Sequence, residues 1–172
     1  MPWLRCLPVA LLVGLIVIHC LPLAIQAVDA PLAGTVDWVY DGDTIKVEPY
    51  CKVRLIGIDA PESEAGPRDD YYLHLGLQRP RLRQTAKEAK TWLIRNLKGK
   101  RVRLSFDRVK HDKHGRLLAY VFLEDGLLIN RLLLEKGLAS VFRRYEFALK
   151  MEFLAVEAAA RAKQVGLWQR QD

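Results

Sequence analysis

Residues 40–63 read YDGDTIKVEPYCKVRLIGIDAPES, and this stretch decides the fold. Apolar and polar residues alternate over Thr44–Val47 and again over Val53–Ile58, which predicts two strands. The Asp41-Gly42 pair before the first run is a turn signal. Pro61 ends the second run, because proline has no N–H to donate to a strand ladder. We therefore expect two neighbouring strands with acidic residues at their ends.

These acidic residues suggest a metal site. If the two strands pair, Asp43 and Asp59 lie at one end of the sheet, with Glu62 three residues further on. Carboxylate oxygens are the ligands that Ca²⁺ and Mg²⁺ prefer, and the planar group of Arg54 suits a phosphate. The combination predicts phosphodiester chemistry. Taken singly, each residue has a plainer role in a salt bridge, a turn or a helix start, and Asp41 is assigned mainly to the turn.

Charge is unevenly distributed along the chain. The protein has 172 residues and a formal net charge of +7, enough chain for one domain with its own core. Residues 78–116 contain fourteen Lys and Arg against three acids, whereas residues 37–70 contain nine acids against four bases. A basic flank beside an acidic pocket fits a polyanionic substrate bound around a metal ion. A solvated helix face is the plainer explanation of the basic run.

The first 27 residues have the pattern of an export signal. Arg5 precedes an apolar run, Leu7–Ile25, and the stretch Ala24-Ile25-Gln26-Ala27 carries the small residues of a cleavage site. This run is nearly long enough to span a bilayer, so an uncleaved membrane anchor is the alternative. We expect an exported protein, secreted or periplasmic, with residues 28–172 as its mature domain. Removal of the signal would leave Cys51 as the lone cysteine and no internal disulfide.

Further along the chain, strands and helices are expected in a mixed order. Three more strands are predicted from alternating runs at Thr35–Tyr40, Arg101–Phe106 and Leu117–Leu123. Helical patterns cover Gln84–Leu97, Ile129–Lys136 and Phe147–Lys163, and Trp92 and Trp168 are assigned to packing. Ser63–Arg83 lacks periodicity and is expected to be a long, partly mobile loop. The predicted fold class is α+β, a single domain built on a small five-stranded barrel whose openings three α-helices cover.

Five short motifs that occur in a fixed order along the chain point to one protein family. They are DGDT (41–44), RLIGIDAPE (54–62), DKHGRLLAY (112–120), EKGLA (135–139) and GLW (166–168). Together they resemble the staphylococcal nuclease, or thermonuclease, family over nearly all of residues 35–168. The resemblance implies an oligonucleotide-binding (OB) fold, a five-stranded barrel with three helices. This agrees with the element order expected from periodicity.

The resemblance also assigns roles to residues at the matching positions. It implies that one Ca²⁺ is bound by Asp43, Asp59 and the backbone carbonyl of Ala60. It further implies a water-activating or water-orienting role for Glu62, phosphate binding by Arg54 and Arg116, and substrate contacts from Lys113, His114 and Tyr145. Two positions depart from the family pattern, because His114 and Arg143 stand where tyrosine is expected. These departures concern base stacking and not the reaction centre.

Two classes of function are compatible with these motifs. The first is a calcium-dependent endonuclease that hydrolyses DNA and RNA with low sequence specificity. The second is a catalytically weak nucleic-acid-binding module that has kept the barrel. Relatives that lose activity lose a metal-binding acid or an arginine, and this chain retains all five of these residues, which favours the enzyme. Nucleic acid is the expected partner of a monomer that meets a membrane only through its N-terminal segment.

Overall fold

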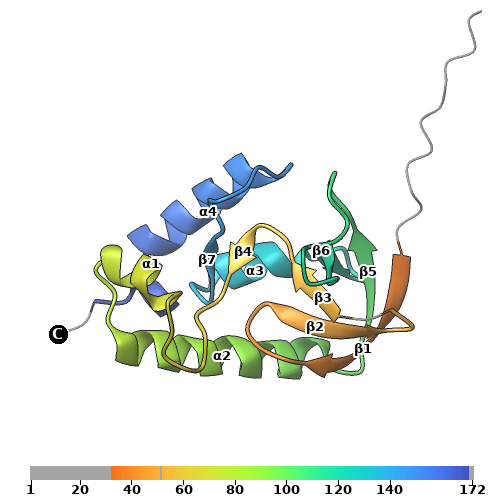
Figure 1. Cartoon of the computed structure of the whole chain (residues 1–172), viewed down its shortest axis with the longest axis horizontal. Coiled ribbons are helices and arrows are strands. Elements are labelled where there is room, and N and C mark those ends of the chain that lie inside the picture. The colour runs from red at the N-terminus through yellow and green to blue at the C-terminus, as the bar shows by residue number, and fades with distance from the viewer. Residues whose placement is uncertain (1–31, 51, 171–172) are drawn as a thin grey trace, which may run out of the picture. The chain divides into compact units, whose positions relative to one another are not determined.

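Five strands close a barrel in the computed structural model, which describes residues 32–50 and 52–170 (Figure 1). In barrel order they are β1 (Leu32–Val39), β2 (Thr44–Glu48), β3 (Lys52–Leu55), β6 (Leu117–Leu123) and β5 (Arg101–Ser105). Neighbouring strands run antiparallel except β3 and β6, which run parallel. The predicted five-stranded α+β barrel is confirmed, and its first strand begins at Leu32, three residues before the expected start.

Side-chain alternation fills the barrel. The inward positions of the strands carry aliphatic residues that are almost fully buried: Val36, Ile45, Val47, Val53, Leu55, Val102, Leu104, Ala119 and Val121. The expected pairing of β2 with β3 is present, with Thr44 opposite Arg54 and Ile45 opposite Val53. Burial of apolar area at about 25 cal/mol per Å² stabilises this register, because a slip by one residue would turn every inward side chain outward.

The predicted single strand Val53–Ile58 is wrong, because the chain turns at Ile56-Gly57. Gly57 has a φ of +80°, a conformation that residues with a side chain rarely adopt. Asn130 fixes the turn, because its Nδ2 donates to the carbonyl of Ile56 at 2.9 Å. Beyond the turn, β4 (Ile58–Asp59) pairs with β7 (Ser140–Val141) in a second, two-stranded sheet. Asp59 therefore lies on a different sheet from Arg54.

The predicted loop over Ser63–Arg83 is also wrong, because most of it is helical. Helix α1 spans Asp69–His74, and α2 spans Arg79–Leu97, five residues longer at its start than expected. Pro80 lies in the first turn of α2, where a missing N–H costs nothing. Leu82 extends the buried stripe of this helix by one turn. Burial of Leu82 stabilises this additional turn, although the sequence before Gln84 has no helical periodicity.

The other helices follow the expected order. They are α3 (Ile129–Glu135), α4 (Lys150–Ala162) and the 3₁₀ turn η1 (Gly166–Trp168), so α4 begins three residues later than predicted. Helix α2 runs along the barrel beside β1, and its other end contacts α1 and η1 (Figure 1). Trp92 packs on the main core, and Trp168 packs on a smaller cluster of Tyr72, Leu82 and Leu167, as expected of packing residues.

The expected signal segment, residues 1–27, and Cys51 lie outside the described residues. Among the described helices, none combines the length and the apolar character that a bilayer crossing requires.

Candidate active site

Strand register and one close backbone contact bring the two aspartates together. Asp43 directly precedes β2, and the carbonyl of Asp43 accepts a hydrogen bond from the N–H of Leu55 on β3 at 2.9 Å. Gly42 allows the turn before β2 to press on the segment after β4. A Cβ at Gly42 would lie only 2.6 Å from the Cβ of Ala60. The turn therefore requires glycine here, and Asp43 comes to lie beside Asp59.

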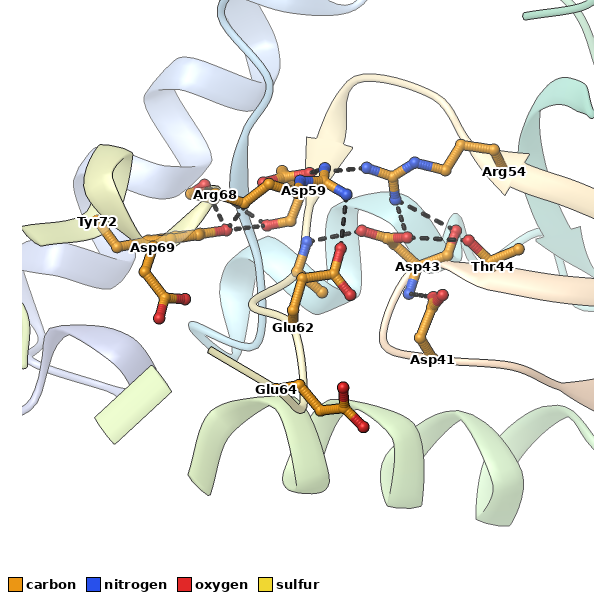
Figure 2. A network of polar contacts seen from close by, with 12 residues as sticks. Asp41, Asp43, Thr44, Arg54, Asp59, Glu62, Glu64, Arg68, Asp69 and Tyr72 are labelled. Carbon is orange, nitrogen blue, oxygen red and sulfur yellow. Dashed lines mark hydrogen bonds and ion pairs between the residues drawn. The ribbon is translucent and has the colours of Figure 1, made fainter. Parts of the chain in front are cut away.

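Arg54 joins the two carboxylates from β3. Its Nη1 forms an ion pair with Asp43 Oδ1, and its Nη2 donates to Asp59 Oδ1 at 2.8 Å (Figure 2). All three side chains are less than 10% exposed. Burial lowers the pKa of Arg54 from its usual value, and the charge of Asp59 opposes that effect. Such a buried trio is stable only while each charge keeps its partner.

Asp43 is held from three further sides. Its Oδ2 accepts the backbone N–H of Ala60 at 2.8 Å, and its Oδ1 accepts the hydroxyl of Thr44 at 3.1 Å. The side chain of Asp41 accepts the backbone N–H of Asp43 at 3.0 Å, which confirms the turn role expected of Asp41. The orientation of the Asp43 carboxylate is therefore fixed by groups within the DGDT motif and by the backbone that follows β4.

Asp59 is hydrogen-bonded to Tyr72, which the sequence did not identify as a site residue. The Tyr72 hydroxyl lies 2.8 Å from the carbonyl oxygen of Asp59 and 3.2 Å from its Oδ2. Ser140 on β7 donates to the Tyr72 hydroxyl at 3.3 Å. Burial, followed by the negative charge of Asp59, raises the pKa of Tyr72 well above its usual value, so the hydroxyl stays protonated and donates. No sequence pattern marked Tyr72, because it lies in the segment without periodicity.

Arg68 is a second cation that the sequence did not identify. Its Nη2 forms an ion pair with Asp59 Oδ1, and its Nη1 donates to Glu62 Oε1 at 2.6 Å (Figure 2). Partial burial lowers the pKa of Arg68, but the charges of Asp59 and Glu62 outweigh it and raise this pKa overall. Glu62 is thus oriented by Arg68, which also contacts Asp59.

Arg116 approaches the site from the start of β6. The parallel pairing of Val53 with Leu117 places Arg116 next to β3. Its Nε donates to Asp112 Oδ2 at 2.7 Å, which fixes the guanidinium within the turn that precedes β6. The positive charge of Arg116 contributes to the lowered pKa of Arg54, after burial and the charges of Asp59, Arg68 and Asp41. Arg54 thus contacts both aspartates, whereas Arg116 lies beside β3 with Asp112 as its partner.

The expected substrate contacts lie at the surface. Lys113 and His114 are exposed in the turn before Arg116, and Tyr145 is 63% exposed. The ring of Tyr145 lies 5.6 Å from that of Phe142, centroid to centroid. Arg143 instead pairs with the buried Glu157 of α4, while its own side chain stays 38% exposed. The arginine that replaces the expected tyrosine therefore has a structural contact.

The aspartates fit a hard divalent cation. Each carboxylate accepts three hydrogen bonds or ion pairs, which leaves about one of its four acceptor positions open. The Ala60 backbone lies beside Asp43, as its N–H contact requires. Within residues 32–50 and 52–170, no three His, Cys, Asp or Glu side chains are grouped so that they hold an ion by themselves. An ion at Asp43 and Asp59 would therefore need the Ala60 carbonyl, water or substrate to complete its shell.

Comparison with known proteins identifies the family of this chain. A family described as staphylococcal nuclease homologue matches residues 52–170. A thermonuclease of Staphylococcus intermedius is 35% identical over 77% of this chain and 73% of its own. An uncharacterized endonuclease of Escherichia coli is 30% identical over 83% of this chain and 81% of its own. An uncharacterized protein of Methanocaldococcus jannaschii is 39% identical over 78% and 70%, respectively. The chain belongs to the staphylococcal nuclease family.

Proposed function

We propose that the protein is an exported, calcium-dependent endonuclease that hydrolyses phosphodiester bonds of DNA and RNA with low sequence specificity. The observation that carries the proposal is the buried Asp43–Arg54–Asp59 trio, to which Glu62 is linked through Arg68. Relatives that carry the names thermonuclease and endonuclease support the nuclease assignment. A basic segment at residues 78–116 suits a polyanionic substrate.

The side chains divide the work of phosphodiester hydrolysis. Asp43, Asp59 and the carbonyl of Ala60 would hold the divalent ion, which supplies Lewis-acid stabilisation of charge on the phosphate when bound. Glu62 accepts a proton from, or orients, the water whose oxygen attacks phosphorus as the leaving oxygen departs in line. The guanidinium of Arg116 donates to the phosphate oxygens, where negative charge builds up in the transition state. Arg54 keeps the two aspartates at a fixed separation and adds its own positive charge.

Low sequence specificity follows from what these groups recognise. The predicted catalytic and metal-binding residues act on the phosphate group of the substrate, and phosphate contacts carry no sequence information. The exposed ring of Tyr145 offers a surface on which any base stacks.

The metal assignment predicts how two conservative variants behave. Asp43→Asn and Asp59→Asn each remove one charged ligand, so each should weaken Ca²⁺ binding and cleavage together. Plasmid nicking and calorimetric Ca²⁺ titration of the purified chain measure the two effects. Glu146→Gln, which changes an exposed carboxylate on the segment before α4, is the matched control and should leave both unchanged. Ca²⁺ titration curves identical to wild type in both aspartate variants would contradict the assignment.

The same assay separates the enzyme from a binding module. Cleavage that requires Ca²⁺ and stops with a chelator supports the nuclease. Retention of plasmid DNA without nicking, at any divalent ion concentration, would favour the catalytically weak nucleic-acid-binding module.

Export predicts where the mature protein begins and how it responds to reductant. After secretion from a bacterial host, the product should begin near Val28 or Pro31, as mass spectrometry of the intact chain measures. Because Cys51 would be its lone cysteine, reductant should not change its thermal midpoint. A product that still carries Arg5 would instead indicate a membrane anchor.

A further inference from the structure

Arg68 occupies the part of the site where a cation is expected. Arg68 is the residue that directly precedes α1, and its side chain contacts the carboxylates of both Asp59 and Glu62 (Figure 2). Two of the three bonds that Asp59 Oδ1 and Oδ2 accept come from arginines, one from Arg54 and one from Arg68. Arg54 is buried and also binds Asp43, whereas the Arg68 side chain is 46% exposed. Of these two arginines, Arg68 is therefore the one whose side chain is free to leave.

The backbone that carries Arg68 is fixed independently of the site. Asp69, the next residue, is 2% exposed and forms an ion pair with Arg83 of α2. Its backbone N–H also donates to the carbonyl of Gly66 at 3.0 Å. Departure of Arg68 from Asp59 therefore requires rotation of its side chain and no unfolding of α1. Residues 62–68 line a surface cavity of about 300 Å³, which gives that side chain space to move.

We propose that Arg68 is a built-in competitor of the divalent ion. In the ion-free protein its guanidinium neutralises Asp59 and Glu62 and holds Glu62 against the site. A divalent ion that binds Asp59 competes with Arg68 for the same carboxylate and repels its positive charge, so Arg68 is released. This inference rests on the proposed metal-dependent function and adds a residue that the family motifs do not include.

Release of Arg68 links ion binding to the other parts of the site. Glu62 loses its only contact in Figure 2 when Arg68 leaves, so its carboxylate becomes available to a water molecule. The released guanidinium is then able to form paired hydrogen bonds to a phosphate of the substrate. The divalent ion thus replaces Arg68 as the partner of the carboxylates. A phosphate of the nucleic acid replaces the carboxylates as the partner of Arg68.

Calorimetric titration of the full chain with Ca²⁺, in the absence of nucleic acid, tests the competition. Arg68→Gln removes a positive charge that lies within hydrogen-bond distance of a metal ligand, so its Ca²⁺ affinity should rise about tenfold. Arg131→Gln is the matched control, because Arg131 is 50% exposed and contacts two carboxylates, Glu135 and Glu152, on α3 and α4. Its Ca²⁺ affinity should stay within about twofold of wild type.

A second variant protects the test against a folding defect. Arg68→Lys keeps the charge but lacks the planar, forked set of donors with which arginine holds carboxylates, so its affinity should lie between those of wild type and Arg68→Gln. Thermal unfolding without Ca²⁺ verifies that each variant is folded. Wild-type or weaker Ca²⁺ affinity in Arg68→Gln, while wild type binds Ca²⁺, would overturn the competition and leave the nuclease proposal in place. Absence of Ca²⁺ binding in wild type and variants alike would overturn the proposed calcium dependence and the competition together.

Discussion

Exchange of Arg54 for glutamine is expected to lower the free energy of unfolding by about 3–5 kcal/mol, the cost of leaving buried charges without their partner. The reason is that Asp43 and Asp59 are both buried and would repel each other once the guanidinium between them is gone. Urea denaturation in the absence of divalent ions measures the loss. Cleavage should be abolished in the same variant.

Calcium should restore part of the stability of Arg54→Gln, because a divalent ion neutralises the same two carboxylates. At an ion concentration of about 100 times the dissociation constant, linkage adds about 2.7 kcal/mol to any folded state that binds the ion. Arg131→Gln, which removes an exposed arginine, should cost less than about 1 kcal/mol and serves as the control. An unfolding free energy equal to that of wild type would show that Arg54 does not hold the aspartates together.

Replacement of Arg116 by lysine is expected to reduce turnover by about a hundredfold or more, the scale observed when one preorganised transition-state donor is lost. Lysine keeps the charge but lacks the planar pair of donors that matches a phosphate. The dependence of nucleic-acid binding on salt should therefore be unchanged, because the number of neutralised phosphates stays the same. Single-turnover cleavage and binding titrations over a range of salt concentrations measure the two quantities.

The converse pattern is expected from the basic flank. Lys87→Gln, on the exposed face of α2, should weaken binding and reduce its salt dependence while turnover at saturation persists. Arg83 is unsuited to this comparison, because it pairs with the buried Asp69 and its loss would disturb α1.

The prediction for Arg116 would be contradicted by near wild-type turnover in Arg116→Lys, or by a parallel loss of binding and turnover. Either result would show that Arg116 only binds the substrate and does not stabilise the transition state.

The sequence was sufficient for the barrel and for the placement of Asp43 beside Arg54, because both depend on short-range order. The alternating runs of β2 and β3 are separated by a few residues, so their pairing places Asp43 next to Arg54 in any register that buries Ile45 and Val53. Glycine at position 42 gives the turn its close contact with Ala60. The motifs around these residues carried the family resemblance for the same reason.

Tertiary structure alone decided the surroundings of the Asp43–Arg54–Asp59 trio. Tyr72 and Arg68 lie in a segment without hydrophobic periodicity, and their roles follow from contacts with Asp59 that depend on where α1 packs. The break of the predicted strand at Gly57 similarly depends on Asn130, which lies more than seventy residues away in the sequence.

The sequence by itself thus determined the five-stranded barrel and the acids and arginines at its edge, because strand alternation and short turns are local properties. Only the tertiary structure decided which cation faces which carboxylate. A charged side chain takes its partner according to burial and distance, and both are set by segments that are far apart in the chain. For that reason Arg54 proved to be a buried link between two aspartates, and Arg68 a partly exposed cation at the same carboxylate.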